Sequence, residues 1–173
     1  MAKLKIFEVP SPVLRQKAAP VAEVSAEIKQ ILSDMLETMY QGNGVGLAGN
    51  QVGILKRLVV LDCAGKDEEP DPIKMVNPKI VDHSAEKIVH HEGCLSVPHQ
   101  FADVDRFQWV VVSYLDENGK QQVQKVEGLL AVAVQHELDH LEGILFIDYL
   151  TAFKRKLLLN KLEKRRQREK EEA

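Results

Sequence analysis

The sequence is poor in the features that mark secreted, membrane-spanning or nucleic-acid-binding proteins. It has only two cysteines, 5% aromatic residues and a formal net charge of -3 at pH 7. Two distant cysteines argue against a disulfide framework, and the mild charge argues against nucleic acid as a substrate. No apolar run approaches the roughly 20 residues of a membrane span, and the opening MAKLKIFEVP lacks the apolar stretch of a signal peptide. These absences predict a cytoplasmic protein with no membrane anchor.

Periodic patterns along the chain predict a mixed fold. Residues 25–44 have apolar side chains at helical spacing behind a Ser25 cap. Five segments have the apolar runs or the alternation that is typical of strands: 57–63, 73–82, 86–91, 108–116 and 120–128. A turn at Asn118 and Gly119 joins the last two. Short strands ahead of one buried helix indicate an α+β domain in which antiparallel sheets wrap that helix. Since a chain of 173 residues can build one core and has no dividing linker, we expect a single domain over residues 1–173.

The predicted buried helix contains the pentapeptide HELDH, residues 136–140, within the apolar run GLLAVAVQHELDHLEGILF. Side chains four apart lie on one face of a helix, so His136 and His140 can offer two nitrogen ligands to one metal ion. Glu137 lies beside that face, in the position of the general base of H-E-x-x-H metallohydrolases. Chance gives roughly 0.02 such matches in a chain of this composition, and the apolar flanks favour a buried helix over a solvated one. The pattern predicts a buried metal centre.

A catalytic centre of this kind needs a third protein ligand. The metzincin pattern is excluded, because Gly143 matches it but Phe146 stands where the third histidine belongs. Glu163 lies in the charged run KLEKRRQREKEE, which is typical of a solvated helix. Cys63 ends the apolar run RLVVLDC and is predicted to be a core residue. Cys94 lies in HHEGCLSVP, a turn that suits an exposed thiolate, and together with the two histidines it would make a plausible ligand set for zinc or ferrous iron. The four other histidines remain candidates as well.

Three segments carry a family resemblance. GVGLAGNQ (residues 44–51), EGCLS (92–96) and QHELDH (135–140) resemble the three signature motifs of the peptide deformylases, in their usual order and spacing. The resemblance extends from SPVLRQKAAPV to HLEGILFIDYL and covers nearly the whole chain. It implies a metal-dependent amidase that removes the formyl group from the N-terminal formyl-methionine of new polypeptides and releases formate, with residues 1–173 as its single catalytic domain.

The resemblance also implies roles for individual residues. In the family, the metal is held by the cysteine of the second motif and the two histidines of the third, here Cys94, His136 and His140. Glu137 would be the acid/base, and Gln51 with the backbone N–H of Leu95 would hold the carbonyl oxygen as it becomes negative. The native metal would be Fe²⁺, whereas the ligand set alone leaves Zn²⁺, Ni²⁺ and Co²⁺ open.

An apolar pocket for the methionine side chain is implied beside the metal. From the positions of the motifs, we expect the pocket to be lined by Val45, Gly46, Leu129, Val132 and Ala133. Each is equally well explained as an ordinary core residue, because buried apolar side chains need no functional reason. A formyl carbon bears only hydrogen, so a site built around it is expected to reject an acetyl group.

Three positions depart from the usual family pattern. Gly49 stands where alanine is common, and we expect the missing methyl to loosen the segment slightly while leaving Gln51 usable. Phe101 stands where many relatives have a basic residue that contacts the peptide, and His90 stands where an aliphatic residue is common near the pocket. The preference for residues beyond the methionine is therefore expected to differ from that of many relatives.

The tail, residues 151–173, is predicted to be a basic helix that extends the domain. From Lys154 onward, nine lysines and arginines stand against four glutamates. Leu157, Leu158 and Leu162 form one short apolar stripe that can dock on the domain, and the part after Glu163 has no apolar face. The family resemblance implies contact with the ribosome through this helix, and the alternative is a solvated helix without a partner.

Two other functions are compatible with the motifs. A zinc peptidase that cuts internal peptide bonds would use the same residue types. A binding protein would hold a structural metal with a fourth protein ligand, such as His91 or His99. The number of protein ligands separates the second alternative from an enzyme, because a catalytic centre leaves one position free.

Overall fold

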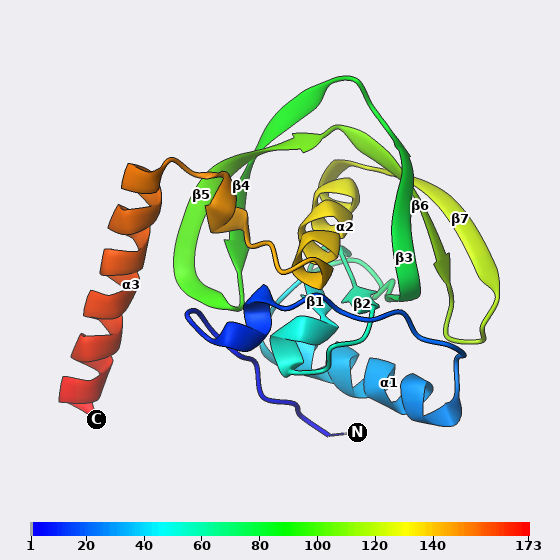
Figure 1. Cartoon of the computed structure of the whole chain (residues 1–173), viewed down its shortest axis with the longest axis horizontal. Coiled ribbons are helices and arrows are strands. Elements are labelled where there is room, and N and C mark those ends of the chain that lie inside the picture. The colour runs from blue at the N-terminus through cyan, green and yellow to red at the C-terminus, as the bar shows by residue number, and fades with distance from the viewer. Residues whose placement is uncertain (1) are drawn as a thin grey trace.

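Helix α2 (Gly128–Leu141) runs through the middle of the molecule in the computed structural model, which describes residues 2–173 (Figure 1). Every residue from 131 to 138 is buried, and so are His140 and Leu141. The prediction of a helix buried almost all round is therefore confirmed. HELDH occupies the C-terminal half of this helix, and its His136, Glu137 and His140 side chains are buried while Asp139 is half-buried.

Two antiparallel sheets surround α2. The larger has the order β1-β2-β3-β6-β7, formed by Gly46–Ala48, Leu58–Leu61, Ile73–His83, Trp109–Leu115 and Gln121–Glu127. The smaller is a hairpin of β4 (Lys87–Cys94) and β5 (Val97–Phe107). Short 3-10 turns lie at Pro12–Arg15, Gly49–Val52 and Phe146–Tyr149. The expected α+β fold, with antiparallel sheets around the motif-bearing helix, is confirmed.

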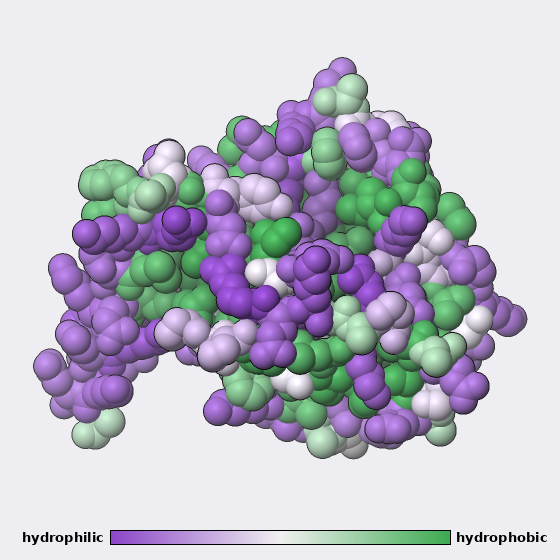
Figure 2. Space-filling view, viewed as in Figure 1, coloured by the Kyte–Doolittle hydropathy of each residue, from purple (hydrophilic) through white to green (hydrophobic). Residues whose placement is uncertain are grey.

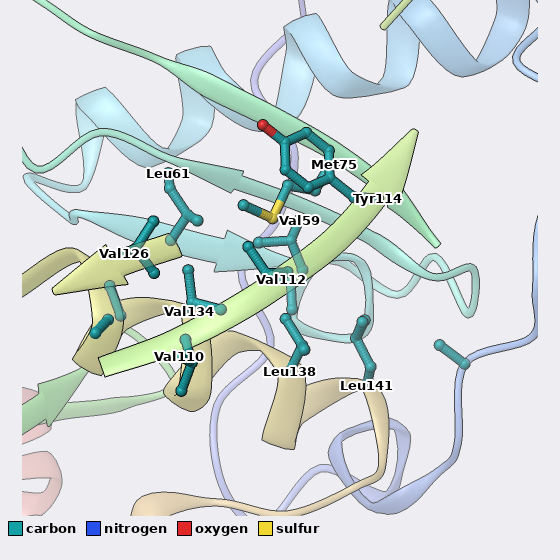
Figure 3. Close-up of a cluster of buried hydrophobic side chains, with 14 residues drawn as sticks. Val59, Leu61, Met75, Val110, Val112, Tyr114, Val126, Val134, Leu138 and Leu141 are labelled. Atoms are coloured by element: carbon teal, nitrogen blue, oxygen red, sulfur yellow. The ribbon is translucent and has the colours of Figure 1, made fainter. Parts of the chain in front are cut away.

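The main core fills the space between the larger sheet and α2. Side chains alternate across β6, so that Val110 and Val112 face the helix residues Val134 and Leu138 in one buried cluster (Figure 3). Strand β2 is buried on both faces: Val59 and Leu61 belong to this cluster, whereas Leu58 and Val60 pack on the side of helix α1. A strand between two helices has no polar face, which explains the continuous apolar run LVVL of residues 58–61.

Helix α1 (Ala26–Gln41) covers the other side of β1 and β2. Its N-terminus is capped as predicted, because the Ser25 hydroxyl accepts a hydrogen bond from the Ile28 N–H at 3.3 Å. The predicted apolar stripe supplies four buried residues, Ile28, Leu32, Met35 and Met39, while Ile31 and Leu36 are half-buried.

Helix α3 (Ala152–Glu172) lies beside β5 and then projects away from the domain (Figure 1). Leu158 and Leu162 dock the helix, because both are buried in the cluster that includes Val104. The projecting end of the helix is hydrophilic (Figure 2). The prediction for Leu157 is wrong: this side chain is 46% exposed, because it lies a quarter-turn away from the docked face. Among residues 2–173, no helix has the length and apolarity needed to cross a membrane.

Strand β5 was not predicted from the sequence. Its segment VPHQFADVDRF contains proline and two aspartates and has no apolar run. It becomes a strand because it pairs with β4 from Phe107 back to Val97, across the tight turn at Leu95 and Ser96. The pairing with β4 here outweighs the weak intrinsic preference of these residues for a strand.

The core cluster leads to a stability prediction. Leu61 is fully buried in it, so Leu61→Ala is expected to lower the free energy of unfolding by about 2–5 kcal/mol. The matched control, Leu157→Ala on the exposed side of α3, is expected to change it by about 0.5 kcal/mol or less. Urea denaturation of both variants measures the difference, and equal losses would contradict the packing described.

Candidate active site

Cys94, His136 and His140 converge on one point between α2 and the end of β4. The Nε2 atoms of the two histidines are 3.2 Å apart, and Cys94 Sγ is 3.3 Å from His140 Nε2. The helix places the two rings one turn apart, edge to face, and a bulge between Gly93 and Cys94 lies where the thiol meets them. Within residues 2–173, this is the one cluster of three or more such side chains whose ligand atoms all lie within 4.8 Å of one another.

This donor set fits a divalent metal ion such as Zn²⁺ or Fe²⁺. Glu92 Oε1 lies 2.9 Å from His136 Nδ1, which places the proton on Nδ1 and leaves Nε2 free to ligate. Burial opposes the charged form of His136, but the Cys94 thiolate and Glu92 outweigh it and raise the pKa of His136 well above its usual value. Burial, reinforced by the charge of His136, lowers the pKa of His140. A cation at this point would take the place of the proton that the cluster otherwise attracts.

Behind His136 lies a buried chain of ion pairs. Arg106 donates to both oxygens of Glu92 at 2.6 and 2.8 Å and to Asp139 Oδ2 at 2.8 Å. The Tyr149 hydroxyl donates to the same Asp139 oxygen at 2.7 Å. Burial raises the pKa of Glu92, but Arg106 and His136 more than offset this effect and hold that pKa at about 2. Arg106 could not be predicted from the sequence, because nothing in DVDRF distinguishes it from a surface arginine. The role of Glu92 was not predicted either, although Glu92 opens the EGCLS motif.

Glu137 is buried beside the ligand atoms. Its Oε1 lies 3.9 Å from His136 Nε2, and its Oε2 is buried without a hydrogen-bond partner. Burial raises the pKa of Glu137 to about 7, which suits a group that exchanges protons near neutral pH. A Cβ on Gly46 would lie 2.7 Å from Glu137 Oε1, so the absence of a side chain at Gly46 makes room for the carboxylate.

Gln51 is fixed next to Cys94. Its Oε1 accepts the Ala48 N–H at 3.0 Å, while its Nε2 donates to Ser96 Oγ at 3.1 Å and lies 3.5 Å from Cys94 Sγ. Gln51 belongs to the 3-10 turn that follows β1, and it is almost completely buried. Ser96, whose hydroxyl orients the Gln51 amide, was not predicted to have a role.

Gly49 does not loosen this turn as expected. A Cβ at that position would lie 2.5 Å from the carbonyl oxygen of Ile54 and 2.7 Å from that of Lys56. The Ile54 N–H also donates to the Gly49 carbonyl at 2.9 Å. The segment 54–56 therefore fills the space of the missing methyl and closes the turn that carries Gln51.

The ligand cluster opens into a cleft of about 550 Å³. All five predicted pocket residues line it: Val45, Gly46, Leu129, Val132 and Ala133. Val132 and Ala133 are buried, whereas Val45 and Leu129 are 42% and 44% exposed and form part of the rim. Leu95 also lines the cleft, and its side chain packs against Gly44, where a Cβ would lie 2.8 Å from it.

Glu163, Cys63, His91 and His99, the other residues considered as ligands, lie outside the cluster. Phe146, which stands where the metzincin pattern has its third histidine, is buried and stacks near His136, with ring centroids 6.1 Å apart. Glu163 is on α3, and His91 pairs with Asp103 on the exposed side of the hairpin. Cys63 packs against the main core, and burial raises the pKa of its thiol to about 11. Cys94 is half-buried at the end of β4, more enclosed than its turn-like sequence indicated.

Comparison with known proteins identifies the family. The family model described as polypeptide deformylase matches residues 3–156. The chain belongs to the peptide deformylase family. The peptide deformylase of Rhizobium meliloti is 47% identical over 156 residues, covering 90% of each chain, and that of Rhizorhabdus wittichii is 47% identical over 171 residues, covering 96% of this chain and 97% of the relative.

Solved deformylases have the same fold. The crystal structure of peptide deformylase from Ehrlichia chaffeensis superposes with a TM-score of 0.92 at 39% identity, covering 97% of this chain and 99% of that one. A complex of the Ehrlichia chaffeensis enzyme with actinonin gives 0.90 at 41% identity, covering 95% and 98%. This deformylase is thus a hydrolase that removes the N-formyl group from new peptides, as the motifs implied.

The ligand assignment leads to a prediction about metal content. Cys94→Ser is expected to lose most of its metal and activity, because a hydroxyl is a poorer ligand than a thiolate for this class of ion. Cys63→Ser, the matched control in the core, is expected to keep its metal. Elemental analysis of both purified variants, with formate release, measures this, and equal metal loss from both would refute the assignment of Cys94.

The contact between Gly46 and Glu137 leads to a second prediction. Gly46→Ala is expected to displace the Glu137 carboxylate and to lower kcat by up to about 100-fold while metal content is unchanged. Gly65→Ala is the matched control, because a Cβ there would have only ordinary contacts at 3.5 Å or more in an exposed loop. Near-normal kcat in Gly46→Ala would show that the carboxylate position is not critical.

Proposed function

We propose that Cys94, His136 and His140 hold one divalent metal ion, Fe²⁺ in the cell, and that Zn²⁺, Ni²⁺ or Co²⁺ can take its place. The observation that carries this proposal is the convergence of three ligand atoms within 4.8 Å beside the buried Glu137 carboxylate. One sulfur and two imidazole nitrogens suit all four ions, and availability decides among them in the cell. A metal with three protein ligands has a coordination position left for chemistry.

When bound, the metal supplies Lewis-acid activation of water and of the formyl carbonyl. Glu137 takes the proton of the attacking water and returns it to the nitrogen of the departing methionine, which a pKa of about 7 permits in both directions. Gln51 Nε2 and the backbone N–H of Leu95 donate hydrogen bonds to the carbonyl oxygen as it becomes negative. Donors of this type each lower the barrier by about 2.7–4 kcal/mol.

The substrate in this proposal is an N-formyl-methionyl peptide. Val45, Leu129, Val132 and Ala133 give the cleft an apolar wall for the methionine side chain, and Gly46 leaves the space between that wall and Glu137 open. The ribosome makes such peptides, so the enzyme acts in the cytoplasm. Residues 1–173 then form one catalytic domain, with residues 151–173 as a basic helical extension.

Glu137 separates catalysis from metal binding. Glu137→Ala is expected to retain its metal and to lose about 10²- to 10⁴-fold in kcat for a formyl-Met peptide, because the proton carrier is gone. Glu127→Ala, an exposed glutamate just before α2, is the control and is expected to behave like the wild type. Turnover of Glu137→Ala within a few-fold of the wild type would mean that another group moves the proton.

The same assay decides between a deformylase and a peptidase. Formyl-Met peptides should release formate, acetyl-Met peptides should react hardly at all, and internal peptide bonds should stay intact. Efficient cleavage of an internal bond would favour the zinc peptidase alternative.

A second proposal concerns α3, which we propose contacts the ribosome. The helix projects from the domain, and its end is hydrophilic and carries an excess of basic residues (Figures 1 and 2). Basic side chains that face RNA phosphates release counterions, so the binding should weaken steeply with salt. In this part of the helix, Arg166 lies 3.4 Å from Glu8 of the domain.

Deletion of residues 164–173 tests this contact. The truncated enzyme is expected to hydrolyse a short formyl-Met peptide normally and to co-sediment less with ribosomes at low salt. A full-length chain with Arg165, Arg168 and Lys170 changed to glutamine should show the same loss, which separates charge from length. Undiminished co-sedimentation of both variants would show that α3 is only a solvated helix.

A further inference from the structure

His90 is a polar residue of the catalytic cleft that takes no part in the proposed hydrolysis. It lies on β4, is half-buried and lines the cleft. Among residues 2–173, neither nitrogen of its ring has a hydrogen-bond partner; Nδ1 is buried, whereas Nε2 is not and is open to the cleft. Polar groups inside proteins nearly always have a partner, so an imidazole left without one beside an active site points to a bound ligand.

The burial of Nδ1 decides which nitrogen of His90 donates. A neutral imidazole carries one proton, on either Nδ1 or Nε2. A buried N–H without an acceptor is rarer and more costly than a buried acceptor without a donor, so Nδ1 is better left without the proton. The proton then lies on Nε2, and His90 presents an N–H donor to the cleft.

The strand places this donor beside the proposed methionine pocket. Alternation puts His90 on the same face of β4 as Glu92, whose carboxylate contacts His136. On α2, Val132 and Leu129 lie about one and two turns before His136, and both line the same cleft. The cleft therefore runs from the metal ligands between the two elements, with His90 on one wall and Val132 and Leu129 on the other.

A donor on this wall distinguishes methionine from its oxidised form. The thioether sulfur of methionine is a weak hydrogen-bond acceptor. Oxidation converts it to a sulfoxide, which makes the side chain polar and supplies an acceptor oxygen. A pocket with apolar walls alone rejects such a group, because the oxygen loses its hydrogen bonds to water and gains none. The Nε2–H of His90 can replace one of these lost hydrogen bonds.

We propose that this deformylase also hydrolyses peptides that begin with N-formyl-methionine sulfoxide, and that His90 Nε2 donates a hydrogen bond to the sulfoxide oxygen. The inference rests on the proposed function, because it uses the same cleft and the same reaction. Water attacks the formyl carbon, formate leaves, and the other product is a peptide with a free amino group on its methionine sulfoxide. His90 is thus a specificity-determining residue for the first side chain.

The test uses the metal-loaded full-length enzyme and measures formate release from three peptides. They are formyl-Met-Ala-Ser, the same peptide with methionine sulfoxide, and the same peptide with norleucine. The two epimers of the sulfoxide are assayed separately, since a donor fixed on one wall reaches the oxygen of one better than that of the other. The wild type is expected to hydrolyse the better epimer with a kcat/KM within about 10-fold of that for formyl-Met-Ala-Ser. A larger deficit would overturn the proposal.

Variants of His90 assign the effect to its N–H. His90→Leu removes the donor and is expected to lower the ratio of kcat/KM between the sulfoxide and methionine peptides by about 10-fold. His90→Gln keeps an N–H donor and is expected to retain most of the ratio. Because the ratio compares two substrates in one preparation, partial loss of folded enzyme does not change it. An unchanged ratio in His90→Leu would refute the role of His90.

The matched control is His83→Leu. His83 lies on β3, outside the cleft lining, and this variant should keep the wild-type ratio.

The methionine and norleucine peptides separate this inference from the proposed function. Neither side chain needs a donor, so the wild type should hydrolyse both. Absence of formate release from both would overturn the proposed function, whereas normal release from both with poor hydrolysis of each sulfoxide epimer would overturn this inference alone.

Discussion

The structure depends on the burial of a polar motif inside a central helix. His136, Glu137 and His140 all lie within the protein, where an unpaired polar group costs several kcal/mol and an unpaired charge costs more. The fold meets this cost with Glu92, which pairs with His136, and with Arg106, which neutralises Glu92 and also pairs with Asp139. The Nε2 atoms of His136 and His140 lie together with Cys94 Sγ, all within 4.8 Å of one another, and this arrangement fits one metal ion.

Three glycines leave space for the side chains and the backbone that lie close to this site. Gly46 leaves the space that Glu137 occupies, and Gly49 lets the backbone of residues 54–56 close over the turn that carries Gln51. Gly93 accepts the Phe101 ring on its bare backbone. Each glycine thus lies where a side chain or a backbone segment approaches closely. The motifs of residues 44–51 and 92–96 therefore shape the space around the motif of residues 135–140.

The sequence was most informative where periodicity or spacing carries the signal. The four-residue spacing of His136 and His140 predicted a shared helix face, and the apolar stripe with Ser25 predicted α1 and its cap. Strand β5 and the role of Arg106 escaped prediction, because each depends on a partner distant in sequence rather than on local pattern. Leu157 shows the limit of composition: three leucines in a tail do not reveal which of them faces the domain.

The central claim is that the metal has three protein ligands, of which one is a thiolate, and a coordination position left for catalysis. The most direct test is the X-ray absorption spectrum of the metal in enzyme prepared without oxygen, recorded with metal content on the same sample. The ligand set of Cys94, His136 and His140 predicts one metal ion per chain, with one sulfur, two imidazole nitrogens and a further light-atom ligand that is not from the protein. A second sulfur ligand, or a third imidazole completing four protein ligands, would contradict this account.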